Sequence, residues 1–94
     1  MTITRHKIKG CCGSLVYVFD MDKPIKKTQI QIFKDANYSV PQNFQTLGIF
    51  YVAMGSLIAT SSFGAKSINI KCFGANCNKL LDDFAIILET AISS

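Results

Sequence analysis

Between Ala36 and Gly74 the chain reads ANYSVPQNFQTLGIFYVAMGSLIATSSFGAKSINIKCFG, which is the most informative part of the sequence. It contains three runs rich in apolar, β-branched and aromatic residues: Leu47–Met54, Leu57–Ser62 and Ser67–Gly74. Glycine and serine residues lie between the runs, where the chain would have to turn. The stretch therefore predicts three consecutive strands joined by short turns.

The last of these strands indicates which side of the sheet is buried. Its alternation places two sets of residues on opposite faces: Ile68, Ile70 and Cys72 on one, and Asn69, Lys71 and Phe73 on the other. We expect the first set to lie in the core and the second outside. For the strand that begins at Leu47, the pattern leaves open which pair points outward: Phe50 and Val52, or Ile49 and Tyr51.

Upstream residues predict an N-terminal strand followed by a helix. The segments His6–Gly10 and Leu15–Phe19 are typical of strand, and Gly10–Gly13 between them predicts a bend or bulge. Asp22 is a candidate cap for a helix that begins near Pro24. This helix presents one face composed of Ile25, Gln29, Ile32, Phe33 and Ala36.

The helix should end near Asn37, because Pro41 disfavours helical angles at Val40, and a short extended loop then leads to Phe44. After Gly74 a second helix is expected, capped by Asn76 or Asn78. Its wide apolar stripe consists of Cys77, Leu80, Leu81, Phe84, Ile87, Leu88, Ala91 and Ile92. The order β-α-β-β-β-α predicts one α+β domain spanning residues 1–94, with both helices on one face of an antiparallel sheet and the other face bare.

Composition favours an interaction role over a self-sufficient monomer. With 49% hydrophobic and 17% charged residues in 94 residues, the chain has more apolar surface than one small core needs. Nine Lys and Arg against three Asp give the part through Cys72 a charge of +6, whereas one Lys against three acids gives the remainder −2. This asymmetry suits an anionic partner on the basic side, and equally a globular domain with an acidic last helix.

The four cysteines give no metal signal. Adjacent Cys11 and Cys12 would point to opposite faces of a strand, and the spacing between Cys72 and Cys77 is unusual for a zinc knuckle. The N-terminus lacks the apolar core of a signal peptide, and no apolar run approaches the length of a membrane span. We expect reduced thiols, no metal, no membrane and an intracellular location in cytoplasm or nucleus.

Catalytic residues are not evident either. His6 is the only histidine, and a solvated or interface role explains it better than general-base chemistry. Asp20 and Asp22 could bind a cation, but a helix cap accounts for Asp22, and Asp82 and Asp83 would lie on the polar side of the last helix. No phosphate loop or catalytic triad is present in the sequence. The chain is expected to be neither an enzyme nor a cofactor-binding protein.

The order of motifs resembles one repeat of the TATA-box-binding protein family. The resemblance rests on Ala36-Asn37-Tyr38 leading through Pro41 to Phe44, the strand Gly48–Val52, Leu57-Ile58 with Ser61-Ser62 and Gly64, and Ile70–Ala75 before the long helix. It covers about 60 residues. That family joins two repeats in one chain, whereas this chain has room for one. The phenylalanines that the family inserts between DNA bases lie in its strands, whereas Phe63 here falls in a turn and Phe73 at a strand end.

A curved face of apolar and amide side chains suits the minor groove of double-stranded DNA. The expected DNA-binding residues are Lys7, Lys9, Lys66, Asn69, Lys71 and Phe73, and the resemblance implies a role in transcription initiation or regulation. A homodimer would recreate the two-repeat saddle, with an interface at the edge strand formed by Arg5, His6, Ile8 and Gly10. The alternative is a protein-interaction or assembly module that uses the same bare face.

Overall fold

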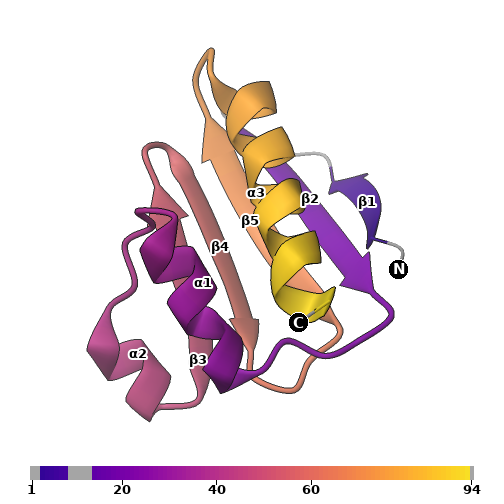
Figure 1. Cartoon of the computed structure of the whole chain (residues 1–94). Coiled ribbons are helices and arrows are strands. Elements are labelled where there is room, and N and C mark those ends of the chain that lie inside the picture. Colours follow the sequence, from indigo (N-terminus) through magenta and orange to yellow (C-terminus); the bar gives the residue numbers. More distant parts are fainter. Residues whose placement is uncertain (1–2, 9–13, 94) are drawn as a thin grey trace.

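The computed structural model describes residues 3–8 and 14–93, with the side chains of residues 14 and 15 excepted (Figure 1). Five strands form one sheet: β1 (Ile3–Ile8), β2 (Ser14–Met21), β3 (Ile49–Met54), β4 (Leu57–Ser62) and β5 (Ser67–Phe73). A 3-10 turn, η1 (Lys27–Gln29), leads into α1 (Ile30–Asp35). The remaining helices are α2 (Gln42–Thr46) and α3 (Cys77–Ser93).

All neighbouring strands are antiparallel, in the order β1-β2-β5-β4-β3. The β3–β4 hairpin turns on two residues, Gly55 and Ser56, because Met54 pairs directly with Leu57. Gly55 has φ +58, the left-handed angle that a tight hairpin requires at its first central position. The other connections let β5 lie between β2 and β4, in the middle of the sheet.

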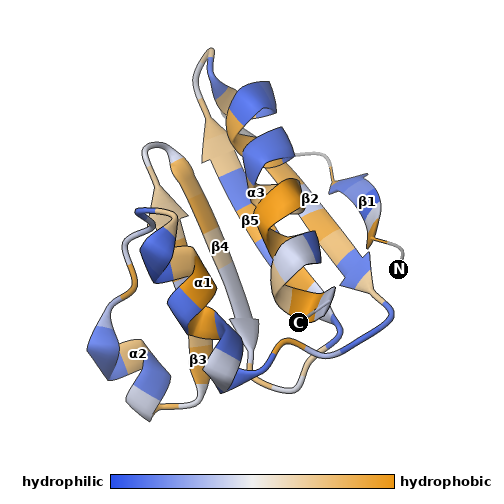
Figure 2. Cartoon of the chain, viewed as in Figure 1, coloured by the Kyte–Doolittle hydropathy of each residue, from blue (hydrophilic) through white to orange (hydrophobic). Residues whose placement is uncertain are grey.

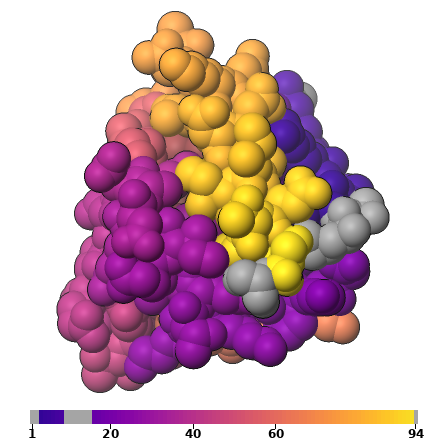
Figure 3. Space-filling model, in the orientation of Figure 1, coloured from indigo at the N-terminus to yellow at the C-terminus, as the bar shows by residue number. Residues whose placement is uncertain are grey.

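Side-chain alternation is strict in β5, where Ile68, Ile70 and Cys72 are fully buried and the residues between them are exposed. In β3, Phe50 and Val52 are buried, so Ile49 and Tyr51 are the outward pair. One face of the sheet therefore faces the core, and the sequence alternation predicted this correctly for β5. Both helices α1 and α3 lie over this face (Figures 1 and 3).

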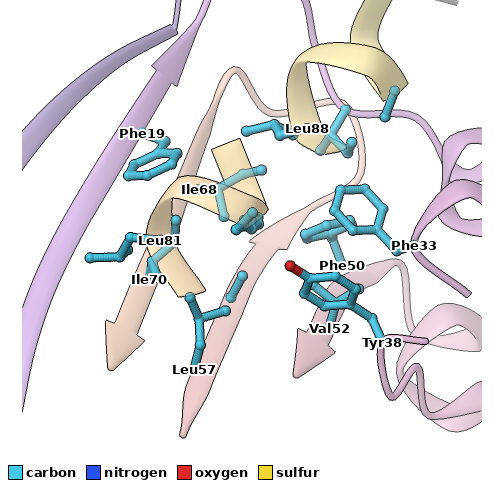
Figure 4. Packing of buried hydrophobic residues seen from close by; sticks show 14 of the residues in the cluster. Phe19, Phe33, Tyr38, Phe50, Val52, Leu57, Ile68, Ile70, Leu81 and Leu88 are labelled. Atoms are coloured by element: carbon cyan, nitrogen blue, oxygen red, sulfur yellow. The ribbon is translucent and has the colours of Figure 1, made fainter. Parts of the chain in front are cut away.

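An aromatic cluster joins the two helices to the sheet. Phe33 of α1 lies 5.3 Å from Phe50 of β3 and 5.6 Å from Phe84 of α3, measured between ring centroids. Phe84 also meets Phe19 of β2 edge-on at 5.9 Å. Edge-to-face aromatic pairs add about 0.5–1.5 kcal/mol each beyond their buried area. Figure 4 shows Phe33, Phe50 and Tyr38 packed together beneath α3, and Figure 2 shows that α3 alternates apolar and polar residues as an amphipathic helix does.

The end of α1 positions Tyr38 in this cluster. Asn37 adopts a left-handed φ of +70, and the Tyr38 and Asn37 amides donate to the carbonyls of Phe33 and Lys34. This is the hydrogen-bond pattern of a Schellman C-cap, in which the residue after the left-handed one packs back on the helix. The Tyr38 ring accordingly lies 5.7 Å from the Phe33 ring.

Three expectations about elements were wrong. The N-terminal segment forms two paired strands, β1 and β2, instead of one strand with a bend, so the order β-α-β-β-β-α lacks a strand. The loop before Phe44 is helical, as α2. Asp22 caps no helix, because the first helical turn begins at Lys27. The α+β class and the antiparallel sheet are confirmed.

Cys72 and Cys77 form a disulfide across the turn from β5 into α3, with Cα atoms 5.8 Å apart. This bond differs from the expectation of four reduced thiols and argues somewhat against a reducing compartment. Both cysteines are buried. Among the described residues, no helix is long and apolar enough to cross a membrane.

The disulfide should stabilise the strand-to-helix turn. Closing a loop this short restricts the unfolded chain by about 2 kcal/mol, which corresponds to roughly 10 °C in melting temperature for a domain of this size. We expect a reductant to lower the melting temperature of the wild type by that amount in calorimetry. A Cys77→Ala variant should melt at the lower temperature and ignore the reductant. A reductant effect of equal size in this variant would contradict the assignment.

Candidate interaction surface

The sheet face opposite the helices carries outward side chains from every strand. In the middle of the sheet these are Val16, Val18 and Asp20 from β2, and Asn69, Lys71 and Phe73 from β5. The strand registers arrange them in cross-strand rows. One row runs His6–Val18–Asn69–Thr60–Tyr51, and the next runs Ile8–Val16–Lys71–Ile58–Ala53. We call this surface the bare face.

One end of the bare face is apolar. Phe73 is 53% exposed and Ile8 is 47% exposed, both high values for large apolar side chains. Val16 and Ile58 are half-buried beside them and line a shallow hollow of about 290 Å³ together with Lys71. Contiguous exposed apolar side chains of this kind mark surfaces that another molecule covers. We call Ile8, Val16, Ile58 and Phe73 the apolar patch.

Charge on the bare face is sparse and separated. Lys71 lies within the apolar patch, between Val16 and Ile58, and toward the other end of the face His6 Nε2 contacts Asp20 Oδ2 at 2.8 Å. Lys66 lies in the turn that leads into β5. Lys7 lies two residues from Arg5 in β1, so both side chains point to the helix side of the sheet, away from Lys71. Lys9 and Gly10 lie outside the described residues.

The two edges of the sheet differ in protection. Ser39 pairs with Ala53 through two backbone hydrogen bonds of 2.8 and 3.0 Å, which cover part of the β3 edge. Phe44 of α2 stacks on Tyr51 with centroids 4.7 Å apart, so α2 closes the outer side of β3. The β1 edge has no strand neighbour beyond β2 among the described residues. An open edge is a place where another chain can pair.

Two of the four expected dimer residues, Arg5 and His6, have partners within the chain. Arg5 contacts Asp82 of α3 at 2.9 Å and lies 5.4 Å from the centre of the Phe19 ring. His6 is paired with Asp20 on the bare face, and Ile8 belongs to the apolar patch. The interactions of Arg5 fasten β1 to the helix layer. Sequence reasoning overlooked Val16 and Ile58, although their alternation with core residues could have identified them.

A second hollow, of about 490 Å³, lies on the helix side between α1, the end of β3 and α3. Met54, Leu80 and Ile87 provide apolar walls, and Tyr38 and Asp83 provide polar groups. Burial and, secondarily, the Asp83 charge raise the pKa of Tyr38 to about 12. We call this hollow the helix groove; nothing in the sequence pattern indicated it.

The Tyr38 hydroxyl should remain protonated well above the ordinary tyrosine pKa of about 10. Between pH 10 and 12 the unfolded chain then loses a proton that the folded chain keeps, so stability falls as pH rises. We expect the wild type to lose roughly 2–3 kcal/mol more than Tyr38→Phe across this range in urea unfolding. Absorbance at 295 nm should show one tyrosine ionising near pH 12 that the variant lacks. Equal losses in both proteins would contradict the assignment.

The chain matches no family model, no curated protein and no solved structure. The resemblance to one repeat of the TATA-box-binding protein family therefore stays a prediction. Function has to be argued from the bare face and the helix groove.

Proposed function

We propose that this chain is a non-enzymatic assembly module whose bare face packs on the bare face of a second copy. The observation that carries the proposal is the apolar patch. It combines the half-exposed Phe73 and Ile8 with Val16 and Ile58 on the sheet face that α1 and α3 leave uncovered. Interface cores are enriched in aromatic residues, and the patch supplies Phe73, with Lys71 as the one charged residue between Val16 and Ile58.

The arrangement of charge supports a second copy as the partner. Lys71 and Asp20 lie on adjacent central strands, near opposite ends of the bare face. When two identical faces stack about a two-fold axis that crosses the strands, each Lys71 approaches the end that bears the other copy's Asp20. A two-fold axis along the strands would instead place Lys71 over Lys71, since β5 is the middle strand. In the first orientation the charges are complementary, and each apolar patch lies over the end of the other copy's bare face that bears Asp20 and Ser67.

Pairing through the β1 edge is the second way to form a homodimer, and charge supports it less well. If two copies join their β1 strands into one continuous sheet with all helices on the same side, residues that point to one face must pair with residues of the other copy that point to the same face. Arg5 and Lys7, which point to the helix side, then pair with Ile3, Arg5 or Lys7 of the other copy. The registers that place Arg5 opposite Arg5 or Lys7 set like charges directly opposite, which destabilises strand pairs.

The size of the bare face predicts a weak dimer. Five strands about 4.8 Å apart and about 20 Å long give a face of about 500 Å², so two copies would bury about 1,000 Å² between them. That is the lower limit for a specific interface. Dissociation constants in the micromolar range are expected.

Sedimentation equilibrium between about 5 and 200 μM tests this proposal directly. We expect a mass that rises from monomer toward dimer, and Phe73→Ser should shift the midpoint upward by at least tenfold. Leu47→Ser, which truncates a side chain that is 70% exposed and outside the bare face, is the matched control. Lys71→Asp and Asp20→Lys should each weaken the dimer, and the double exchange should restore it. A monomer at every concentration, or equal effects of Phe73→Ser and Leu47→Ser, would refute the proposal.

Double-stranded DNA is a second candidate partner, within a TATA-binding-protein-like architecture that acts in transcription. The specific observation is that Asn69, Lys71 and Phe73 project from consecutive outward positions of β5, with Lys66 at its start. Helices on one side of the sheet and an uncovered opposite face support this architecture. The added strand β1 departs from the order on which the resemblance rests.

Fluorescence anisotropy with a labelled A·T-rich duplex tests the DNA proposal. Binding at 50 mM salt should weaken steeply by 200 mM salt if lysines contact phosphates. Lys66→Glu with Lys71→Glu should abolish it, whereas Lys34→Glu on α1 should have a much smaller effect. No binding at micromolar protein in low salt would exclude this candidate and leave the assembly role intact.

A further inference from the structure

The helix groove contains a tyrosine hydroxyl to which no group of the described chain hydrogen-bonds. Tyr38 is only 6% exposed, and within the described residues its hydroxyl makes no hydrogen bond. A tyrosine whose ring is buried usually directs its hydroxyl toward a hydrogen-bond partner. The Tyr38 ring packs against Phe33 and against Phe84, whose ring centroid lies 6.1 Å away. These contacts fix the position of the hydroxyl oxygen. The helix groove is the space from which a partner can reach it.

Two opposite charges stand at the rim of the helix groove. Lys79 and Asp83 are one turn apart on α3, where such residues commonly pair. In this structure they form no ion pair within 4 Å, and both are exposed. The rim therefore offers a cation and a carboxylate one helical turn apart, and Asn76 also lines the groove.

The remaining wall is apolar. Met54, Leu80 and Ile87 line it, and all three are only partly buried although they pack on the core. The volume of about 490 Å³ lies within the range of small-molecule sites. It is too small for a folded partner. It is sufficient for a molecule with one apolar group of side-chain size.

We propose that the helix groove binds a free α-amino acid with an apolar side chain. Its ammonium group would donate to the Asp83 carboxylate and to the Tyr38 oxygen, and its carboxylate would accept from Lys79 and Asn76. Its side chain would contact Met54, Leu80 and Ile87. This zwitterion satisfies both rim charges and the unpaired hydroxyl together, whereas an amine or an acid alone leaves one charge unused. The site is separate from the bare face and does not depend on the assembly role.

Titration of the 15N-labelled full-length protein with L-leucine tests this inference. We expect saturable shifts in the amides of residues 36–38, 54 and 76–87, with little change on the bare face. Isopentylamine, which lacks the carboxylate, and 4-methylpentanoate, which lacks the ammonium group, should each bind at least tenfold more weakly. L-Aspartate, which lacks the apolar side chain, should bind more weakly than L-leucine by a similar factor.

Variants assign the polar contacts. Tyr38→Phe, Asp83→Asn and Lys79→Gln should each weaken L-leucine binding by about tenfold to a hundredfold, as expected for losing one hydrogen bond to a charged group. Glu89→Gln on the same helix, outside the groove lining, should bind as the wild type does. Thermal unfolding confirms that each variant is folded.

Three results would overturn the inference. Isopentylamine binding as tightly as L-leucine would indicate a site for cationic amphiphiles, without a role for Lys79. Equal loss in Glu89→Gln and Asp83→Asn would indicate charge screening instead of a site. If none of these compounds shifts the amide resonances at 10 mM, the groove binds no such ligand and only water hydrogen-bonds to the Tyr38 hydroxyl. Each result is independent of the sedimentation experiment.

Discussion

The packing of Phe33 against Phe50 and Phe84 is the interaction on which the rest of the structure depends. It places α1 and α3 on the same side of the sheet and fills the space between them with aromatic rings. Close-packed interiors tolerate little rearrangement, so this cluster also fixes where Tyr38 and α3 can lie. Because α1 and α3 both lie on this side, only α2 among the described helices is left for the other, where its Phe44 stacks on Tyr51.

The net charge of this protein is a poor guide to its partner, because few of its cations lie on the bare face. The net charge is +4, yet Lys27 and Lys34 lie in η1 and α1 on the helix side, and Lys7 points to the helix side of β1. On the bare face, Lys71 is the main cation among the described residues, and Asp20 and His6 are already paired. A surface with this composition is better suited to protein contact than to a polyanion, since phosphate binding scales with the number of cations presented.

The long helix α3 is fastened at several points, and these restraints shape the helix groove. Cys77 ties its first turn to β5, Asp82 ties its first half to β1 through Arg5, and Phe84 inserts into the core. A helix held in this way keeps Asp83 and Lys79 at a fixed distance from Tyr38. A site built on rigid elements loses less conformational entropy on binding than one built on loops.

Sequence alone determined the features that depend on neighbours along the chain. The alternation in β5 identified its buried and exposed faces, the apolar stripe identified α3, and the residues before Pro41 marked the end of α1. These patterns are local because a strand repeats every two residues and an α-helix every 3.6.

The tertiary structure alone decided that Ile49 and Tyr51 face outward, that residues 3–8 pair with β2 as a separate strand, and that Cys72 meets Cys77. It also decided that Tyr38 opens into the helix groove, since that hollow is formed by α1, β3 and α3, which are distant in sequence. The physical reason is that pairing and packing depend on which surfaces meet in space, and no local repeat encodes that meeting.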